Sequence, residues 1–262
     1  MVTMPIAAIR SFYRLSAILW TAFEGAMKFI VMKLGGRASE AERAEWLHGV
    51  CLRALRRVGI PVEHSGNIPE SGLIVANHLS YLDILALSAL TPSVFIAKKE
   101  VRTWPIFGWI AGKAGTRFVD RKRKLETGKV IESVGEALRA GLSVVLFAEG
   151  TSADGSGVLP FRPSLFEPAL AAEAMITPAY ISYTASSGSV ANDVCFWGEV
   201  SFLPHSCKLF AIERVTARIR FGPTLRNLRD RKQAAESTRA EVLRLADLQA
   251  TEHEAPASKM GA

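Results

Sequence analysis

Three observations predict an α/β fold for this chain. Short apolar runs typical of buried strands alternate with segments of helical periodicity between residues 60 and 225. The length of 262 residues suits one domain with appendages, and 49% of the residues are hydrophobic, enough for a large core. Strands are expected at 73–77, 94–98, 116–120, 143–147, 176–183 and 215–221, and helices at 81–90, 105–113, 125–139 and 164–173.

The first 59 residues are expected to form a two-helix element ahead of that domain. Apolar residues recur at helical spacing from Leu15 to Leu34, with Trp20 near the border of the apolar side. The polar side is expected to carry Arg14, Thr21, Glu24 and Lys28. Charges interrupt the stretch, so it falls short of the ~20 uninterrupted apolar residues that a membrane span needs. The pattern is typical of a helix in the membrane interface, and also of one packed on a core.

A second helix is expected to follow within the same element. Ser39 and Glu42 have the spacing of a capping box, which predicts a helix start. Gly59 and Pro61 then predict its end. The domain proper is expected over 60–225, and residues 226–262 are expected to form a surface helix and a frayed tail.

The composition limits the kinds of binding partner and the cellular compartment that are expected. A net charge of +7 and a pI near 9.5 suit an anionic membrane surface or an acidic carrier protein. No aromatic-rich nucleic-acid motif is visible, so nucleic acid is not an expected partner. The three cysteines are far apart, which predicts neither a disulfide framework nor a structural zinc site and fits a reducing cytosol. No small-residue cleavage site follows the first apolar stretch, so a signal peptide is not expected.

The segment Asn77-His78-Leu79-Ser80-Tyr81-Leu82-Asp83 follows the apolar run at residues 73–76. His78 is therefore expected at the exit of a buried strand, with Asp83 in the first turn of the next helix. A histidine whose ring is held by a carboxylate is suited to accept a proton. Ser80 and Asp83 also have the spacing of a helix cap, and Asn77 suits either a positioning role or a plain turn.

Polar residues follow two later strands in the same way. Arg121 ends the run at 116–120, and Glu149 begins Glu149-Gly150-Thr151 after the run at 143–147. A glutamate directly after a buried strand is unexpected unless it has a partner or a role. Ligands of open α/β sheets bind beyond the carboxyl ends of the strands, so these groups are expected to converge on one cleft.

These motifs resemble those of the glycerolipid acyltransferases, the 1-acylglycerol-3-phosphate acyltransferase family. The family signature is Asn-His-x-x-x-x-Asp, then Gly-x-x-Phe-x-x-Arg, then Phe-Pro-Glu-Gly-Thr, then a Val-Pro block. The chain carries all four in order, with Ala148 replacing a proline and Thr177-Pro178 as the last block. The matching positions are Asn77, His78, Asp83, Gly115, Phe118, Arg121, Phe147, Glu149, Gly150 and Thr151.

The resemblance implies a single glycerolipid-acyltransferase-type domain, a mixed β-sheet flanked by helices. It implies an O-acyltransferase that moves a fatty acyl group from an acyl carrier protein or CoA thioester to the hydroxyl of a membrane lysolipid. Neither a cofactor nor a metal is expected. It also favours the membrane interface for the first helix, at the cytoplasmic face of the inner membrane. By this resemblance His78 takes the proton, Asp83 sets its tautomer, and the acceptor is bound by Arg121, Glu149, Gly150, Thr151 and, as a further anion contact, Arg162.

The sequence departs from the lysophosphatidate branch just after Thr151. Ser152 stands where those enzymes usually have an arginine, which removes a cation for a phosphate. The stretch from Glu149 to Phe166 looks instead like the lyso-ornithine lipid acyltransferase branch, whose acceptor has a zwitterionic head. Asp154 then suits either the amine of that head or a simple turn. A lyso-ornithine-type acceptor is therefore expected, with lysophosphatidate as the alternative.

Two other functional classes remain compatible with parts of the sequence. A non-catalytic membrane-binding protein suits the charge and the amphipathic start, but leaves the joint presence of His78, Asp83, Arg121 and Glu149 unexplained. A lipid thioesterase would use water in place of the lysolipid. The apolar segment at 104–110 suits either an acyl-chain groove or ordinary core packing.

Overall fold

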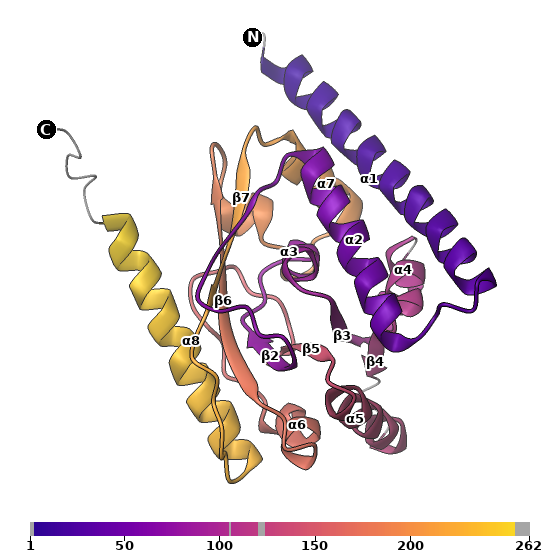
Figure 1. Cartoon of the computed structure of the whole chain (residues 1–262). Helices are drawn as coiled ribbons and strands as arrows, with labels where there is room; N and C mark the ends of the chain where they lie inside the picture. The colour runs from indigo at the N-terminus through magenta and orange to yellow at the C-terminus, as the bar shows by residue number, and fades with distance from the viewer. Residues whose placement is uncertain (1–2, 105, 120–123, 255–262) are drawn as a thin grey trace, which may run out of the picture.

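The computed structural model describes residues 3–104, 106–119 and 124–254, which form one seven-stranded sheet with helices on both faces (Figure 1). The strand order is β1-β7-β6-β2-β5-β3-β4. Strands β6, β2, β5, β3 and β4 are parallel, whereas β7 runs antiparallel to β6 and carries β1 with it. The predicted mixed sheet is therefore confirmed. The strands are β1 (Val62–Ser65), β2 (Gly72–Ala76), β3 (Ser93–Lys98), β4 (Arg117–Val119), β5 (Ser143–Phe147), β6 (Ile176–Ala185) and β7 (Val215–Phe221).

The two central strands explain why the apolar runs were so clear in the sequence. Every residue of β2 and β5 is buried, because helices cover both faces of the sheet there. In the register, Ala76 lies opposite Phe147 on one side and Ala179 on the other. The loops that leave β2 and β5 therefore emerge next to each other at one edge of the sheet.

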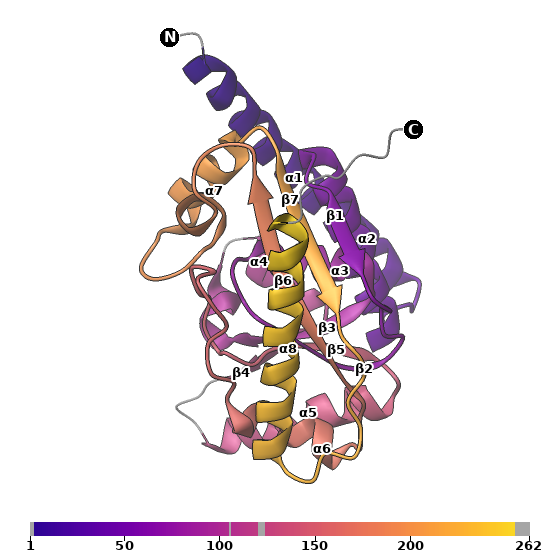
Figure 2. The ribbon, with the colours of Figure 1, turned by 90° about the vertical axis from the view of Figure 1, so that its left-hand side faces the viewer.

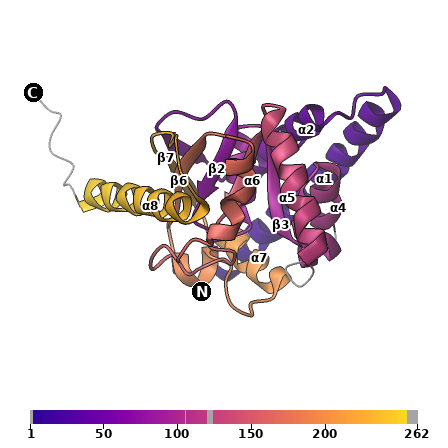
Figure 3. The ribbon, with the colours of Figure 1, turned by 90° about the horizontal axis from the view of Figure 1, so that it is seen from below.

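Helices divide the core into two layers. One layer lies under α1 (Thr3–Leu34), α2 (Glu40–Val58), α3 (Leu82–Leu90), α4 (Phe107–Lys113) and α7 (Phe202–Ala211). The other lies under α5 (Lys124–Arg139), α6 (Glu167–Ala171) and α8 (Arg231–Glu254). Helix α8 runs along β6 (Figure 2), on the side of the molecule opposite α1, α2 and α4 (Figure 3). Shorter turns are η1 (Lys99–Thr103), η2 (Pro163–Phe166) and the π-helical η3 (Val190–Val194).

The predicted boundaries of α2 are confirmed by its caps. The Ser39 hydroxyl accepts the backbone N–H of Glu42, and the Glu42 carboxylate accepts the backbone N–H of Ser39 at 3.0 Å. At the other end Gly59 has a φ of 67°, a left-handed conformation that glycine adopts without steric cost.

The first helix differs from the sequence prediction in length and orientation. It begins at Thr3, so Pro5–Leu34 is long and apolar enough to cross a membrane by length and composition, contrary to expectation. Most of its expected polar side faces the protein, whereas Lys28 is exposed. Arg14 and Thr21 are buried, and Glu24 forms an ion pair with Arg57 of α2 at 2.7 Å.

Arginine donors explain why this polar side turns inward. The Arg14 guanidinium donates to the carbonyls of Ile212 at 2.6 Å and Glu213 at 2.9 Å, at the C-terminal end of α7. Arg10 donates to the carbonyl of Ala211 at 2.8 Å. These carbonyls lack helical partners, and cationic donors satisfy them. The outward face of α1 is apolar and carries Ile6, Ile9, Phe12, Tyr13, Leu19, Trp20, Phe23, Met27, Ile30, Val31 and Leu34.

All six predicted strands are present, whereas β1, α7 and the short turns η1 and η3 were not predicted. Strand β1 is short and mostly exposed, so it has no apolar run to reveal it. Helix α7 contains Pro204 and has no side-chain cap at its start, so the usual start signals are missing. The helix expected at 105–113 is α4, which begins only at Phe107, and the 3-10 turn η1 lies before the expected range.

Candidate active site

His78 and Asp83 form a hydrogen-bonded pair at the exit of β2. His78 Nδ1 lies 2.7 Å from Asp83 Oδ2. The Asp83 side chain is fully buried in the first turn of α3, whereas the His78 side chain is 21% exposed. The His78 ring stacks on Phe147 at the end of β5, with 4.1 Å between ring centroids. The pairing leaves Nε2 as the ring nitrogen for exchange with a substrate.

The surroundings of Asp83 decide between the two roles that the sequence allowed. The N-cap residue of α3 is Tyr81 and makes no side-chain cap, so the cap through Ser80 is not formed. Asp83 Oδ2 instead accepts the backbone N–H of Leu79 at 2.7 Å and of Ser80 at 3.0 Å. Asp83 Oδ1 accepts the hydroxyl of Tyr183 from β6 at 2.5 Å. One carboxylate therefore orders the loop after His78 and also holds the His78 ring.

Asn77 fixes the same loop to the neighbouring strand. Its side-chain oxygen accepts the N–H of Ile181 at 2.7 Å, and its amide donates to the carbonyl of Ile181 at 2.9 Å. This two-way pairing extends the β2–β6 contact by one side chain beyond the end of β2. Asn77 thus positions the His78 loop and is not a plain turn residue.

Glu149 lies buried behind His78, with only 3% of its surface exposed. Its Oε2 accepts the backbone N–H of His78 at 3.2 Å, and its Oε1 accepts that of Leu159 at 3.0 Å. Desolvation raises the pKa of the Glu149 carboxyl to about 7, against the opposing effect of these two donors. Both oxygens bind the protein's own backbone, so the carboxylate joins two loops and does not face the cleft as an acceptor ligand.

The loop after β5 closes around His78 from the other side. The backbone N–H of Ala153 donates to the carbonyl of His78 at 2.9 Å, and Gly150 supplies a turn with a φ of 74°. The Ser152 hydroxyl donates to the carbonyl of Phe196. Asp154 accepts both the N–H and the hydroxyl of Ser156, at 2.9 and 2.7 Å, which is the turn role anticipated for it.

A cleft of about 300 Å³ opens over His78. Its polar lining includes Lys98 at the end of β3, together with Thr151 and Ser152. Its aromatic lining includes Trp104 and Phe196. Among the described residues, the lining of the cleft therefore combines His78 and the cation Lys98 with a largely apolar wall.

A nearly apolar cavity of about 110 Å³ adjoins this cleft between α1, α2 and α4. Trp104, Phe107 and Ile110 line it, so the apolar segment at 104–110 borders a cavity and is not simply core packing. The cleft and the cavity are adjacent, because they share the lining residues Tyr81, Ile84, Phe95, Val101, Trp104, Ala111 and Thr116.

The predicted site residues do not all reach this cleft. His78, Gly150 and Thr151 line it, and Asp83 and Glu149 lie buried behind His78. Arg162 instead lines a neighbouring pocket of about 270 Å³ with residues of α5 and α6. Arg121 falls outside the described residues.

Sequence reasoning missed Lys98 and Tyr183. Lys98 ends a strand, so the rule that selected Arg121 and Glu149 applied to it as well. Tyr183 is seven residues into β6, and only the pairing of β6 with β2 shows that it reaches Asp83. No spacing in the sequence carries that information.

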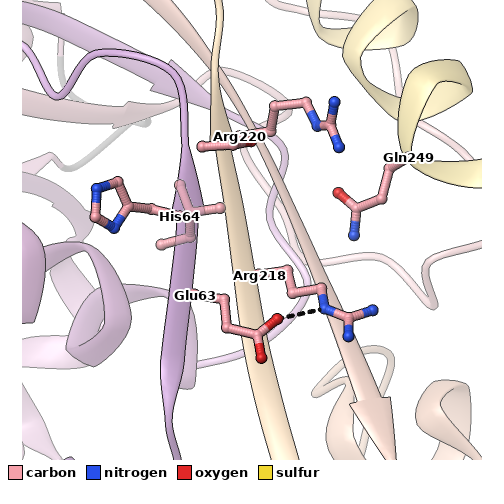
Figure 4. A pocket seen from close by; sticks show the side chains of 7 residues that line it. Glu63, His64, Arg218, Arg220 and Gln249 are labelled. Carbon is pink, nitrogen blue, oxygen red and sulfur yellow. Dashed lines mark hydrogen bonds and ion pairs between the residues drawn. The ribbon is translucent and has the colours of Figure 1, made fainter. Parts of the chain in front are cut away.

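A separate pocket, of about 440 Å³, lies away from His78, between β1, β7 and α8 (Figure 4). Arg218 pairs there with Glu63 at 2.8 Å, and both side chains are partly exposed. Arg220 and Gln249 extend into the same space, while the His64 ring points away from the ion pair.

Comparisons with known proteins agree with this geometry. Residues 59–182 match the family model for acyltransferases. A lyso-ornithine lipid O-acyltransferase of Brucella abortus is 37% identical over 181 residues, which are 64% of this chain and 68% of that protein. A 1-acyl-sn-glycerol-3-phosphate acyltransferase of Neisseria gonorrhoeae is 36% identical over 142 residues, which are 51% of this chain and 56% of that protein.

The fold also matches a solved structure. The crystal structure of the 1-acyl-sn-glycerophosphate acyltransferase from Thermotoga maritima superimposes with a TM-score of 0.70 over 98% of both chains, at 18% identity. The likeness in sequence and in fold, with the histidine–aspartate pair at the expected strand end, leads to one conclusion: the chain belongs to the acyltransferase family and is an acyltransferase.

Proposed function

We propose that the protein transfers a fatty acyl group from an acyl carrier protein or CoA thioester to the hydroxyl of lyso-ornithine lipid. The observation that carries the proposal is the 2.7 Å pairing of His78 with the buried Asp83, beside a cleft that adjoins an apolar cavity. A held, neutral imidazole is suited to remove a hydroxyl proton near neutral pH. The apolar cavity suits a hydrocarbon chain.

The proposed reaction proceeds by direct attack on the thioester. His78 Nε2 takes the proton of the acceptor hydroxyl while its oxygen bonds to the thioester carbonyl carbon. The tetrahedral intermediate then expels the thiolate, which takes the proton back from His78. Asp83 keeps the Nδ1 proton in place and stabilises the imidazolium through the short contact seen here. The donor thioester is the only co-substrate that this chemistry needs.

Two features support lyso-ornithine lipid as the acceptor. The Brucella abortus relative, named for that activity, matches the chain over 181 residues. In addition, Ser152 replaces a cation of the lysophosphatidate branch, and its hydroxyl is used to hold the carbonyl of Phe196. A phosphate monoester in the cleft would therefore meet less positive charge. Asp154 is engaged in its turn with Ser156, so it lends no support to binding of the amine.

One observation favours lysophosphatidate as the second candidate acceptor. Lys98 lines the cleft at the end of β3 and supplies a cation that a phosphate would use. The Neisseria gonorrhoeae relative, named for that activity, is 36% identical. The two acceptors share the attacking hydroxyl, so the chemistry at His78 is the same for both.

We further propose that the apolar outer face of α1 lies in the membrane interface, at the cytoplasmic face of the inner membrane. Eleven large apolar side chains are exposed on it, among them Phe12, Trp20 and Phe23, while its inner face packs on α2 and α7. The net charge of +7 adds attraction to anionic lipids.

The acceptor assay tests these proposals. Purified protein in mixed micelles receives acyl carrier thioester with lyso-ornithine lipid, with lysophosphatidate, or with no acceptor. We expect kcat/KM to be about tenfold or more higher for lyso-ornithine lipid. A preference for lysophosphatidate would overturn the acceptor, and acyl release without any lysolipid would indicate a thioesterase.

The His78→Ala variant tests the assignment of the base. We expect loss of transfer by about 10³-fold or more, since the proton acceptor is removed. His64→Ala is the matched control, because His64 is an exposed histidine on β1, away from the cleft. A His78→Ala protein that is folded and keeps most of its activity would sink the proposal.

A further inference from the structure

The hydroxyl of Tyr183 reaches the His78–Asp83 pair from strand β6. The Tyr183 side chain is 6% exposed and donates to Asp83 Oδ1 at 2.5 Å. Asp83 Oδ2 binds His78 Nδ1 and two backbone N–H groups. Asp83 is shielded from solvent, so Tyr183 is the donor that occupies its second oxygen.

The sheet register fixes the direction of this tyrosine. Along β6, Ala179, Ile181 and Tyr183 belong to the core layer under α3, whereas Tyr180 packs in the opposite layer. Asn77 binds the backbone of Ile181 from both sides, two residues before Tyr183. The exit of β2 therefore holds β6 at the height that brings the hydroxyl of Tyr183 to Asp83.

We propose that Tyr183 is a positioning residue for the acyl transfer. Its hydroxyl holds Asp83 in the orientation that pairs with His78, and it draws charge from that carboxylate, so it sets the pH at which His78 becomes a free base. The inference rests on the proposed function, because it requires His78 to act as the base.

The physical basis is the division of one negative charge among several donors. A carboxylate that gives charge to a phenol binds an imidazolium less strongly, so the imidazole loses its proton at lower pH. Burial, with the charge and hydrogen bond of Asp83, raises the pKa of Tyr183 well above its ordinary value, so the hydroxyl stays a donor throughout the working range.

Other titratable groups near the pair are Glu149 after β5, Lys98 at the end of β3, Tyr81 at the start of α3 and Cys195 after η3. Desolvation raises the pKa of the Cys195 thiol to about 12, so this group is silent near neutrality. Burial likewise raises the pKa of Tyr81. Desolvation raises the pKa of Glu149 to about 7, so Glu149 is left unchanged in every variant whose pH profile is compared.

The test measures kcat/KM against pH for Tyr183→Phe, with Tyr180→Phe as the matched control. Both changes remove one hydroxyl from β6, but Tyr180 faces the other layer. For Tyr183→Phe we expect the acid limb to move to higher pH by about half a unit or more, and kcat/KM at neutral pH to fall about 3- to 30-fold. Tyr180→Phe should leave the profile in place.

A 3-fluorotyrosine at position 183 sharpens the test and keeps the volume of the side chain. Its phenol is a stronger donor, so the acid limb should move to lower pH, opposite to Tyr183→Phe. This variant remains informative if Tyr183→Phe does not fold. If the acid limb of the pH profile does not move in the folded variants, the proposed role of Tyr183 is overturned.

The role of Tyr183 and the proposed function can fail separately. If His78→Ala is inactive while the Tyr183 variants keep the wild-type profile, only the positioning role is lost. If His78→Ala remains active, the base assignment is lost, and the positioning role with it.

Discussion

The His78 cleft and the Arg218 pocket hold charged side chains in opposite ways. Behind the cleft, Asp83 and Glu149 are 0% and 3% exposed, and backbone N–H groups bind both carboxylates. In the pocket of Figure 4, Glu63 pairs with Arg218 along two neighbouring strands, with side chains 58% and 32% exposed. Buried charges that accept several hydrogen bonds have a fixed geometry. In exposed ion pairs, by contrast, salt screens the attraction and the side chains remain mobile.

The difference follows from where each group leaves the sheet. Asp83 and Glu149 lie just beyond strand ends, where loop N–H groups lack partners in the sheet and turn toward a carboxylate. Glu63 and Arg218 lie within paired strands, whose backbone groups already bond to each other. Charged groups that take part in catalysis are therefore expected at the strand ends. Charged groups along the strands are expected to contribute only solubility or modest stability.

Among substitutions of these carboxylates, the largest effect is expected for Asp83→Asn. The amide oxygen can still accept from the His78 loop, but the negative charge that supports the imidazolium is gone, so kcat/KM should fall about 10²- to 10⁴-fold. Steady-state transfer of the acyl group measures it. The matched control is Asp230→Asn, since Asp230 accepts the N–H groups of Lys232 and Gln233 at the start of α8 without a histidine. Equal losses in both variants would mean that Asp83 acts only through the fold.

A smaller effect with a distinct pH signature is expected for Glu149→Gln. The new amide group would face one of the two backbone donors, so one loop is released and kcat/KM should fall about 10- to 100-fold. Because the pKa of Glu149 is raised from 4.5 to about 7, the folded protein binds this proton more tightly than the unfolded chain. The contribution of Glu149 to the free energy of unfolding is therefore largest at low pH and is lost as the pH rises through 7.

Denaturant unfolding between pH 5 and 8 measures this contribution. The wild type should lose about 1–3 kcal/mol more than Glu149→Gln across that range. Glu167→Gln, at an exposed ion pair with Arg231, serves as the control and should follow the wild type. Parallel curves for wild type and Glu149→Gln would contradict the buried, loop-joining role.

The smallest effect is expected for Glu63→Gln in the Arg218 pocket. An exposed pair contributes about 0–1 kcal/mol, and salt screens it, so stability should change little and the difference should shrink in 1 M salt. Transfer activity should equal that of the wild type. An activity loss of about tenfold or more would show that this pocket takes part in function and would remove the contrast between the two regions.

The sequence was most informative where a feature depends on neighbouring residues. Buried runs predicted six strands, and the order of strand ends predicted that His78 and the loop after β5 meet. Features that depend on distant contacts were not predictable. Which side of α1 faces the protein depends on the hydrogen bond from Arg14 to the carbonyl of Ile212, about 200 residues away in the sequence. The contact of Tyr183 with Asp83 depends on the register of β6. The role of Glu149 as a bridge between loops depends on Leu159 returning to it.

Arg10 and Arg14 bind α1 to carbonyls at the end of α7, so the first helix is an integral part of the domain. Removing residues 1–34 would expose the end of α7, whose Phe202 borders the apolar cavity and whose His205 contacts Tyr81. Helix α1 thus lines the apolar cavity with its inner face and carries the exposed apolar side chains on its outer face. If the outer face of α1 lies in the membrane interface, as proposed, the packing of α1 on the domain sets the depth of His78 relative to the bilayer.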